Sequence, residues 1–189
     1  MNGIVVYGSK YGTTKIYSET LAEKLNFDCY DYKKVNKNNI DNYDCIIYGG
    51  GLYSGGVLGL SKTIKKINNF NEKEIIIFTV GLSDPLNNEN VVNIRKNIKN
   101  QIPDEVYKED KLFHLRGGID YSKLTFKDKT MMNLLYKKVK KIPIENQDVE
   151  TKAIIETFNK QVDFVNLESL KSLENHLILA KLFYKELVK

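Results

Sequence analysis

Ser9, Thr13 and Thr14 place three hydroxyl side chains in one polar turn, GSKYGTT. The turn follows a short β-branched run at 4–7, typical of a buried strand, and precedes a helical apolar pattern over 16–25. A helix that begins here offers backbone N–H groups with no partner inside the helix, and such groups attract anions. The turn therefore predicts a phosphate site, with ordinary helix capping by serine and threonine as the alternative.

The turn does not match the common nucleotide-binding motifs. Thr13 rather than lysine follows Gly12, so the GxxxxGK[ST] loop of nucleoside triphosphatases is absent. The glycine spacing of the dinucleotide fingerprint is missing too. The remaining chemistry suits a single phosphate, with no motif lysine and no metal ligand.

A second loop, Gly49–Gly56, contains five of the twelve glycines of the chain. Glycines directly after a buried strand let the backbone approach a flat ligand or adopt positive φ. Leu52 and Tyr53 would offer apolar and aromatic surface to that ligand, and packing against a neighbouring helix is their alternative role. In a third loop, Gly81–Pro85, Asp84 either braces a turn or contacts a polar ring edge.

Strands and helices alternate along the chain, and this alternation positions the three loops. Strand-like runs are expected at 4–7, 27–32, 43–51, 73–81 and 111–119, and helical patterns at 58–67 and 91–102. Such alternation implies a parallel sheet covered on both faces and wound right-handedly. Ligands of these sheets lie beyond the carboxyl ends of the strands, so the three loops should gather at one edge.

Composition and charge exclude several classes of protein. With 189 residues, 42% hydrophobic and 28% charged, the chain has the size and composition of one globular domain. The sequence shows no bilayer-spanning apolar run and no signal peptide, so a cytoplasmic location is expected. Cys29 and Cys45 are expected to be buried thiols, and His114 and His176 belong to no catalytic set. The net charge of +5 permits an acidic partner, but no nucleic-acid motif accompanies it.

Together the three loops resemble those of the flavodoxin family. SKYGTT is similar to the family's phosphate loop, usually written [ST]-x-[ST]-G-x-T, with Tyr11 in place of the middle hydroxyl. The resemblance covers about residues 1–164. It implies a three-layer α/β fold whose five-stranded parallel sheet has the order 2-1-3-4-5 with helices on both faces. The implied flavodoxin-like domain spans 1–165, and a C-terminal helical extension spans 166–189.

The resemblance also implies FMN as the cofactor. The implied phosphate ligands are Ser9, Lys10, Tyr11, Gly12, Thr13 and Thr14. The isoalloxazine ring would lie between two further sets of residues, Gly50, Gly51, Leu52, Tyr53, Ser54 and Gly55 on one side and Gly81, Leu82, Ser83 and Asp84 on the other. No catalytic side chain and no metal ligand is predicted.

A basic and apolar segment, LRGGIDYSKLTFKDKTMMNLLYKKVKK, follows the fifth strand. It resembles a helical insertion, here at about 117–142, of the family branch that contains the menaquinone-dependent protoporphyrinogen oxidase. Between 121 and 141, Asp128 alone opposes the lysines, which are Lys123, Lys127, Lys129, Lys137, Lys138, Lys140 and Lys141. A basic amphipathic helix is typical of contact with an anionic membrane surface or an acidic partner. The alternative is a solvated helix whose apolar side packs on the sheet.

The last segment of the chain, 166–189, also has a helical pattern. One face would carry Leu170, Leu173, Leu177, Ala180, Tyr184 and Leu187. A helix packed on the body is expected, and a homodimer contact is the alternative.

The leading functional prediction is an FMN-dependent oxidoreductase or electron carrier that exchanges electrons with a redox partner protein. One alternative is a protoporphyrinogen oxidase-like enzyme that passes electrons to a quinone, so that a quinone or a tetrapyrrole would be the small-molecule partner. Another alternative is a non-catalytic flavodoxin-like binding module that has lost its cofactor. The intact hydroxyl loop argues against that loss.

Overall fold

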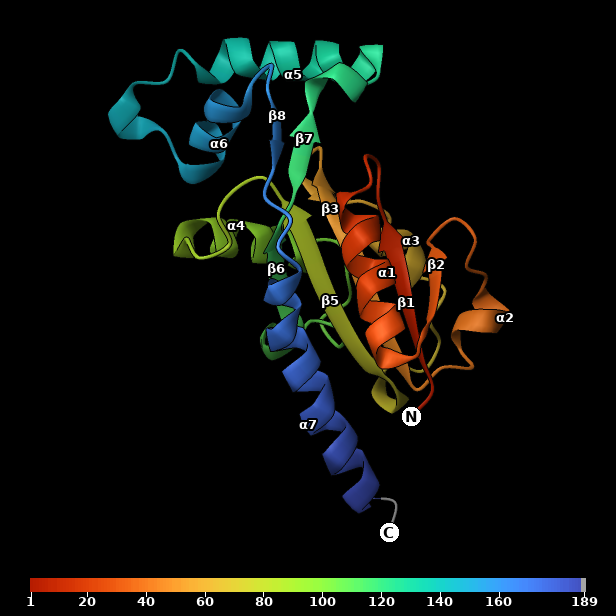
Figure 1. Ribbon diagram of the computed structural model, residues 1–189. Helices are drawn as coiled ribbons and strands as arrows, with labels where there is room; N and C mark the ends of the chain where they lie inside the picture. Colours follow the sequence, from red (N-terminus) through yellow and green to blue (C-terminus); the bar gives the residue numbers. More distant parts are fainter. Residues whose placement is uncertain (188–189) are drawn as a thin grey trace.

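Five parallel strands form the central layer of the protein, as Figure 1 shows for the computed structural model. The structure describes residues 1–187, apart from the side chains of residue 38 and of residues 180–187. The strands pair in the order β2 (Asp28–Asp31), β1 (Gly3–Gly8), β3 (Cys45–Tyr53), β5 (Glu74–Gly81) and β6 (Leu112–Arg116). Counting only the parallel strands along the chain, this is the expected order 2-1-3-4-5, which is confirmed. A short strand, β4 (Gly56–Val57), pairs antiparallel with the end of β3.

Side chains of the central strands alternate between two separate hydrophobic cores. In β1, Ile4 and Val6 enter the core on one face and Val5 enters the core on the other, and all three are at most 1% exposed. Ile46 and Ile47 of β3 divide in the same way. The expected burial of these strands on both faces is confirmed, and it explains why their sequences are continuously apolar.

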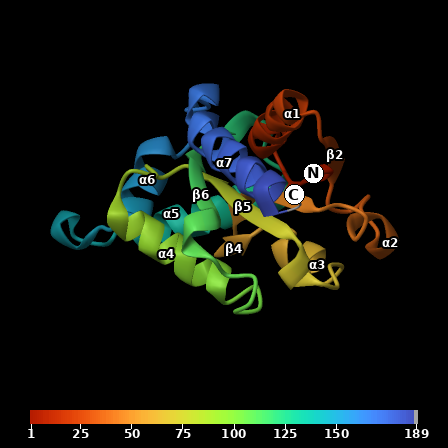
Figure 2. The same cartoon turned by 90° about the horizontal axis from the view of Figure 1, so that it is seen from below.

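Helices cover both faces of the sheet, as Figure 2 shows from below. On one face lie α1 (Thr13–Leu25) and α7 (Lys171–Leu187). On the other face lie α3 (Leu60–Ile64) and α4 (Asn88–Lys99), with the short α2 (Lys37–Ile40) beside the edge strand β2. Short 3₁₀ turns occur at Phe70–Glu72, Glu109–Lys111, Tyr121–Lys123, Ile144–Asn146 and Leu167–Leu170.

The C-terminal segment packs on the body of the protein. Leu170, Leu173 and Leu177 are completely buried and share a core with α1 and the sheet. Lys24 of α1 forms an ion pair with Glu174 of α7 at 2.7 Å. The other residues expected on this apolar face, at 180, 184 and 187, lie outside the described side chains. The described part of this segment therefore contributes to the core on one face of the sheet.

Between β6 and α7 the chain leaves the sheet and forms an arm, residues 118–163. The arm contains an antiparallel ribbon of β7 (Gly118–Asp120) and β8 (Gln161–Asp163), and two helices, α5 (Phe126–Val139) and α6 (Val149–Thr157). The strand expected over 111–119 is interrupted, because the Gly117 N–H bonds to the Gly81 carbonyl at 2.7 Å and β7 then pairs with β8. The arm starts where the insertion at about 117–142 is expected and continues to Asp163.

One buried hydroxyl holds both ends of the arm to the body. The Tyr17 hydroxyl donates to the carbonyl of Arg116 and accepts from the backbone N–H of Asn166, both at 2.8 Å. Arg116 also donates from Nε to the Leu82 carbonyl at 2.9 Å, and its guanidinium lies 3.7 Å from the centre of the Phe164 ring. The segments that enter and leave the arm are therefore fixed to each other and to α1.

We expect the Tyr17→Phe variant to be less stable by about 1–3 kcal/mol, because it removes the two hydrogen bonds that join the Arg116 carbonyl and the Asn166 N–H to the buried Tyr17 hydroxyl. Urea unfolding would measure the change. The matched control is Tyr30→Phe on β2, where the side chain is 45% exposed and a change within about 0.5 kcal/mol is expected. Equal stability of the two variants would contradict the role given to the Tyr17 hydroxyl.

Stability should also fall in mild acid because of His114 on β6. Burial, together with the nearby Arg95, lowers the pKa of His114 to about 4, while its Nδ1 lies 2.8 Å from Thr79 Oγ1. The unfolded chain, with an ordinary pKa near 6.5, then binds the proton more readily between about pH 6.5 and 4. We expect protonation of His114 in the unfolded chain to lower the free energy of unfolding by up to about 3 kcal/mol over that range. The His114→Gln variant should lose less stability than the parent protein as the pH falls, as measured by unfolding curves at several pH values. The same loss in both proteins would contradict the role given to His114.

Candidate functional site

The pairing of β1, β3 and β5 brings the three expected loops to one edge of the sheet. Gly8 at the end of β1 lies opposite Gly50, and Gly51 lies opposite Val80. Gly81, where β5 ends, is opposite Arg116. The loops after these strands therefore begin side by side, as expected from the alternation of strands and helices.

The first loop joins β1 to α1 and leaves the helix start open. Gly12 is the N-cap with φ +101°, and no side chain caps the helix. Ser9 Oγ instead accepts the Gly12 N–H at 3.1 Å, and the first intrahelical bond in this turn runs from Ile16 to the Gly12 carbonyl. The N–H groups of the first helical turn thus have no partner within the helix. Thr14 is 2% exposed, and its Oγ1 would lie 3.2 Å from a Cβ at Gly51 of β3.

The expected loop 49–56 is mostly strand, because β3 continues beyond the expected strand end at Gly51 to Tyr53 and β4 begins at Gly56. Gly49, Gly50 and Gly51 belong to β3. A Cβ at Gly49 would overlap the Phe78 ring and one at Gly50 would overlap Val57, so these glycines permit close packing within the protein. The turn itself is Ser54–Gly55, with φ of 51° and 76°. Only Gly55 has open space on its Cβ side among the glycines of this segment.

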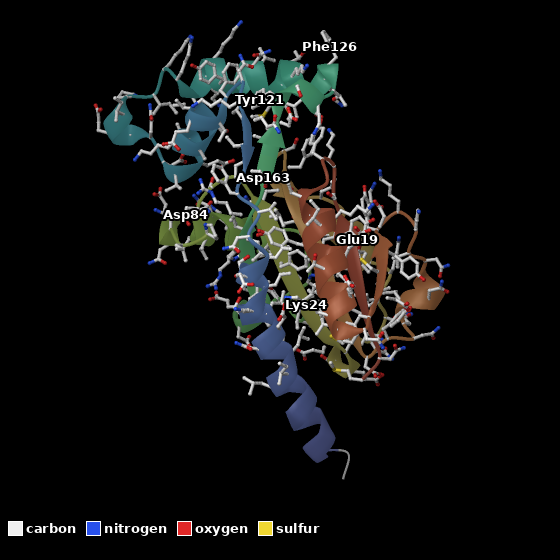
Figure 3. All side chains as sticks on the ribbon, in the orientation of Figure 1. Glu19, Lys24, Asp84, Tyr121, Phe126 and Asp163 are labelled. Carbon is white, nitrogen blue, oxygen red and sulfur yellow. The ribbon has the colours of Figure 1, made fainter. Side chains whose placement is uncertain are left out.

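The third loop is braced by its own side chains. The Asp84 carboxylate accepts the Leu86 N–H at 2.9 Å, and the Asp84 carbonyl accepts from Asn90 Nδ2 at 2.9 Å. Figure 3 shows Asp84 beside α4. Of its two expected roles, the structure shows the turn-bracing one. Gly81 packs so closely on Leu52 that a Cβ there would lie 2.7 Å from Leu52 Cδ1.

A carboxylate of the arm contacts the first two loops. Asp128, in the first turn of α5, has a side chain only 2% exposed. It accepts hydrogen bonds from Lys10 Nζ at 2.7 Å, from the Tyr53 hydroxyl at 2.8 Å and from the Tyr11 hydroxyl. Thr125 Oγ1 donates to it at 2.9 Å. Lys10 also donates to the Tyr53 hydroxyl at 2.8 Å, and its Nζ lies 4.2 Å from the centre of that ring.

These contacts keep Asp128 ionised. Burial by itself would raise the pKa of the Asp128 carboxyl, but the hydrogen bonds from Lys10, Tyr11, Tyr53 and Thr125 outweigh it and hold the pKa well below its usual range. Burial would lower the pKa of Lys10, but the hydrogen bond between Lys10 and Asp128 outweighs burial and raises this pKa. The pair is therefore charged at neutral pH, and its charges cancel.

Asp128 is the residue that the sequence did not assign to the site. Two signals were available: it is the one acid among the lysines between 121 and 141, and Thr125 precedes it at the spacing of a capping box. Neither signal points to Lys10, which is 118 residues away. The side chains of Lys10 and Tyr11, expected on a phosphate, are directed to Asp128 in this structure.

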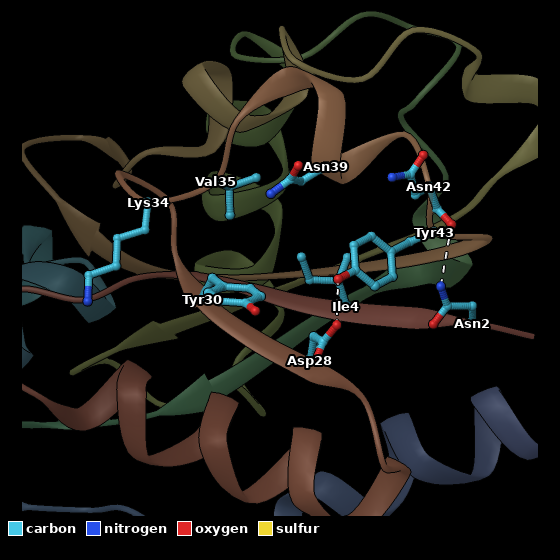
Figure 4. A pocket seen from close by; sticks show the side chains of 9 residues that line it. All are labelled: Asn2, Ile4, Asp28, Tyr30, Lys34, Val35, Asn39, Asn42 and Tyr43. Atoms are coloured by element: carbon cyan, nitrogen blue, oxygen red, sulfur yellow. Dashed lines mark hydrogen bonds between the residues drawn. The ribbon is translucent and has the colours of Figure 1, made fainter.

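A separate pocket of about 250 Å³ lies at the β2 edge of the sheet (Figure 4). Asp28 and Tyr43 line it and are hydrogen-bonded to each other, and this bond raises the pKa of Tyr43 to about 12. Its lining also includes Tyr30 and Lys34. None of the expected site residues lines this pocket.

Other reactive groups of the described residues form no second centre. Burial raises the pKa of the Cys29 thiol to about 11, and Cys45 is fully buried. No cluster of three histidine, cysteine or acidic side chains suitable for a metal ion occurs in the described part of the chain. Within the same residues, no helix combines the length and apolar character needed to cross a bilayer.

Comparison with known proteins adds a family match. The model of the flavodoxin-domain family matches residues 4–144, which include all three loops and α5. An uncharacterised protein of Methanocaldococcus jannaschii is 35% identical over 83 residues. Those residues make up 43% of this chain and 55% of the relative, so the chain spans about half the length of that relative.

Solved structures with a similar fold include two flavodoxins. Oxidised flavodoxin 2 of Bacillus cereus is 14% identical with a TM-score of 0.45, over 61% of this chain and 84% of that one. A flavodoxin from the domain Archaea is 18% identical with a TM-score of 0.42, over 68% and 88% of the two chains. These comparisons give no support to the finer resemblance to a protoporphyrinogen oxidase.

We expect the Asp128→Asn variant to loosen the arm, because it keeps the side-chain size but leaves Lys10 without its counter-ion. The free energy that holds the arm to the loops should fall by about 2 kcal/mol. This is less than for a fully buried ion pair, because the Lys10 side chain is 34% exposed. Hydrogen exchange of peptides from 118–163 should accelerate by about ten-fold or more, with α4 peptides unchanged. Asp104→Asn, at an exposed site, is the control. Unchanged exchange in the arm would contradict the role given to Asp128 and would show that the contacts at the base of the arm are sufficient to hold it.

Proposed function

The chain belongs to the flavodoxin-domain family, and we propose on that premise that it binds FMN and carries electrons. The observation that carries the proposal is the start of α1, which lacks a side-chain cap and is flanked by the Ser9, Thr13 and Thr14 hydroxyls. Unpaired helix N–H groups with nearby hydroxyls suit a terminal phosphate. The absence of the dinucleotide glycine spacing favours FMN over FAD or NAD.

The residues present fit a bound flavin phosphate and ring. A Cβ at Gly12 or at Gly55 would meet no atom within 4 Å, so the backbone of both loops borders open space. Asp128, the acid that contacts Lys10 and Tyr11 of the first loop, is paired with Lys10 and adds no net charge beside a phosphate. The donor set is neutral hydroxyls and backbone N–H groups, which is the chemistry that a single phosphate requires.

Each loop would then have a distinct role. The hydroxyls of Ser9, Thr13 and Thr14 would hold the phosphate, and Lys10 and Tyr11 would contribute through their backbone N–H groups. The ring would lie between the turn Tyr53–Gly55 and the loop Gly81–Asp84. When bound, FMN would supply the redox chemistry, and the protein would supply binding, orientation and electrostatics.

Tyr53 would orient the ring from a fixed position. Its hydroxyl accepts from Lys10 and donates to Asp128, both at 2.8 Å, and the Lys10 ammonium lies over its ring. These contacts restrict the rotation of the half-buried Tyr53 side chain. A flat ligand would meet an aromatic surface that is already in place, which lowers the entropy cost of binding.

A second candidate function, protoporphyrinogen oxidation with a quinone as acceptor, has one supporting observation. The arm borders the turn assigned to the flavin: Met131 Sδ lies 3.7 Å from Ser54 Oγ, and Asp128 contacts Tyr53. A tetrapyrrole or quinone that reached this turn would pass the arm. Measuring reoxidation of the reduced flavoprotein by a soluble menaquinone analogue would test it, and a rate equal to that of free FMN would exclude it.

A binding module that has lost its cofactor is the alternative from a different class. The absorption spectrum of the purified protein separates the two, because bound flavin absorbs in the blue and bleaches on reduction. A colourless protein that also fails to take up added FMN would overturn the electron-carrier proposal.

We expect the Thr13→Val and Thr14→Val variants to bind FMN more weakly, because each keeps its shape but loses a hydroxyl donor to the phosphate. The Kd should rise about five-fold or more per lost hydrogen bond, and further where the bond is charge-assisted. Fluorescence titration measures it.

Two controls accompany this titration. Riboflavin lacks the phosphate, so its Kd should be the same for both variants and the parent. Thr130→Val, on an exposed part of α5, should not change the affinity for either ligand. Equal losses for FMN and riboflavin would contradict the phosphate assignment.

A further inference from the structure

The outer face of α5 is exposed, basic and apolar at the same time. We define this face by helical spacing as Phe126, Lys127, Thr130, Leu134, Lys137 and Lys138. Phe126 is 88% exposed and Leu134 is 64% exposed, although both are large and apolar. Ile144, in the turn after the helix, is 79% exposed. Two large apolar side chains of α5, and a third in the turn after it, are therefore exposed to solvent.

The opposite face of α5 accounts for the packing of the helix. Asp128 and Val139 are buried there, and Tyr136 stacks on Phe158 with ring centres 3.8 Å apart. Tyr121 meets the same Phe158 ring edge-on at 5.5 Å. These contacts already bury one apolar side of the helix. The apolar residues of the outer face are therefore not needed to pack α5 against the rest of the arm.

The charge on the outer face has one sign. Lys127, Lys137 and Lys138 are all exposed, and Lys140 and Lys141 continue the basic run in the following turn. The acid of the helix, Asp128, points inward and is paired with Lys10. Among the described side chains, the next acid after the helix is Glu145, in the 3₁₀ turn.

We propose that the outer face of α5 binds the surface of an anionic lipid membrane. Lysines near such a surface are attracted to acidic headgroups, and exposed phenylalanine, leucine and isoleucine side chains enter the boundary between headgroups and acyl chains. An acidic protein would need an apolar groove matched to Phe126 and Leu134 as well as acids matched to the lysines. A lipid surface satisfies both.

The position of α5 suits contact with an extended surface. In Figure 1 the helix lies across the end of the arm that is farthest from α7, and Figure 3 shows Phe126 at the N-terminal end of this helix. The arm stands away from the sheet, so the body does not cover this side of the helix. Because Asp128 of the same helix contacts Lys10 and Tyr53, a membrane-bound α5 would hold the candidate site near the lipid surface.

Flotation of the full-length protein with vesicles tests the proposal. Vesicles with phosphatidylglycerol should recover the parent protein at low salt and lose it at high salt, while vesicles of phosphatidylcholine alone should recover little. Replacing Lys127, Lys137, Lys138 and Lys141 together by glutamate should lower partitioning by about a thousand-fold or more. The matched control replaces Lys33, Lys34, Lys37 and Lys65 by glutamate, which makes the same change in net charge beside α2 and α3.

The outcomes separate a docking face from general charge attraction. Loss of flotation in the α5 variant with retention in the control supports the proposal. Equal loss in both variants would overturn it in favour of net charge, and failure of the parent protein to float would also overturn it. Circular dichroism of each variant shows that it is folded. None of these measurements requires FMN, so their failure is distinct from failure of the proposed cofactor.

Contact of the apolar side chains with lipid has its own measurement. The chain contains no tryptophan, so Phe126→Trp introduces a single probe on the outer face. Its emission should shift to the blue on addition of anionic vesicles, and the emission of Tyr30→Trp, on the 45% exposed side chain of β2, should not. A Phe126→Trp emission that is unchanged while the protein floats would overturn membrane docking and leave an acidic partner as the occupant.

Discussion

Close contact of glycine-rich β3 with its neighbours is the constraint on which the candidate site depends. Gly49 lies against the Phe78 ring of β5, and Gly50 lies against Val57 of β4, with no room for a Cβ at either position. This contact lets β3 pair with β1 on one side and β5 on the other through to their carboxyl ends. The loops after all three strands then begin at the same level. A larger residue in β3 would separate the strands and with them the two sides of the proposed flavin site.

The arm depends on a second interaction, the burial of one carboxylate. A buried charge is costly unless it is paired and fully hydrogen-bonded, and Asp128 meets both conditions through Lys10, Tyr11, Tyr53 and Thr125. The Tyr17 hydroxyl holds the two chain segments at the base of the arm. The arm is thus fixed at its base and again at the loops. Its position relative to the proposed site is therefore set by polar contacts, whereas the sheet is set by apolar packing.

Helix α5 divides its charges between two environments. Its acid faces inward and pairs with Lys10 of the first loop, and its lysines face solvent beside exposed phenylalanine and leucine. This division leaves the proposed FMN site without excess charge from the arm while giving the outer surface a strong positive potential. Because Asp128 and the outer lysines belong to the same helix, binding at the outer face of α5 would fix the position of the proposed FMN site relative to the bound surface.

The sequence by itself determined the buried strands and a hydroxyl-rich turn at the start of a helix, whereas the strand order 2-1-3-4-5 followed from the resemblance to the flavodoxin family. β-branched runs such as 4–7 can be satisfied only by burial on both faces, and the hydroxyls of Ser9, Thr13 and Thr14 lie within one local turn, so short-range chemistry is sufficient for both. Only the tertiary structure decided that Gly49 and Gly50 serve packing, that the chain leaves the sheet at Gly117, and that Asp128 reaches Lys10. Each of these depends on residues far apart in the chain: pairing of β7 with β8 joins residues 118 and 163, and the Asp128 contact spans 118 positions. No periodicity or local motif records such a contact, because its energy arises only when the fold has brought the two partners together.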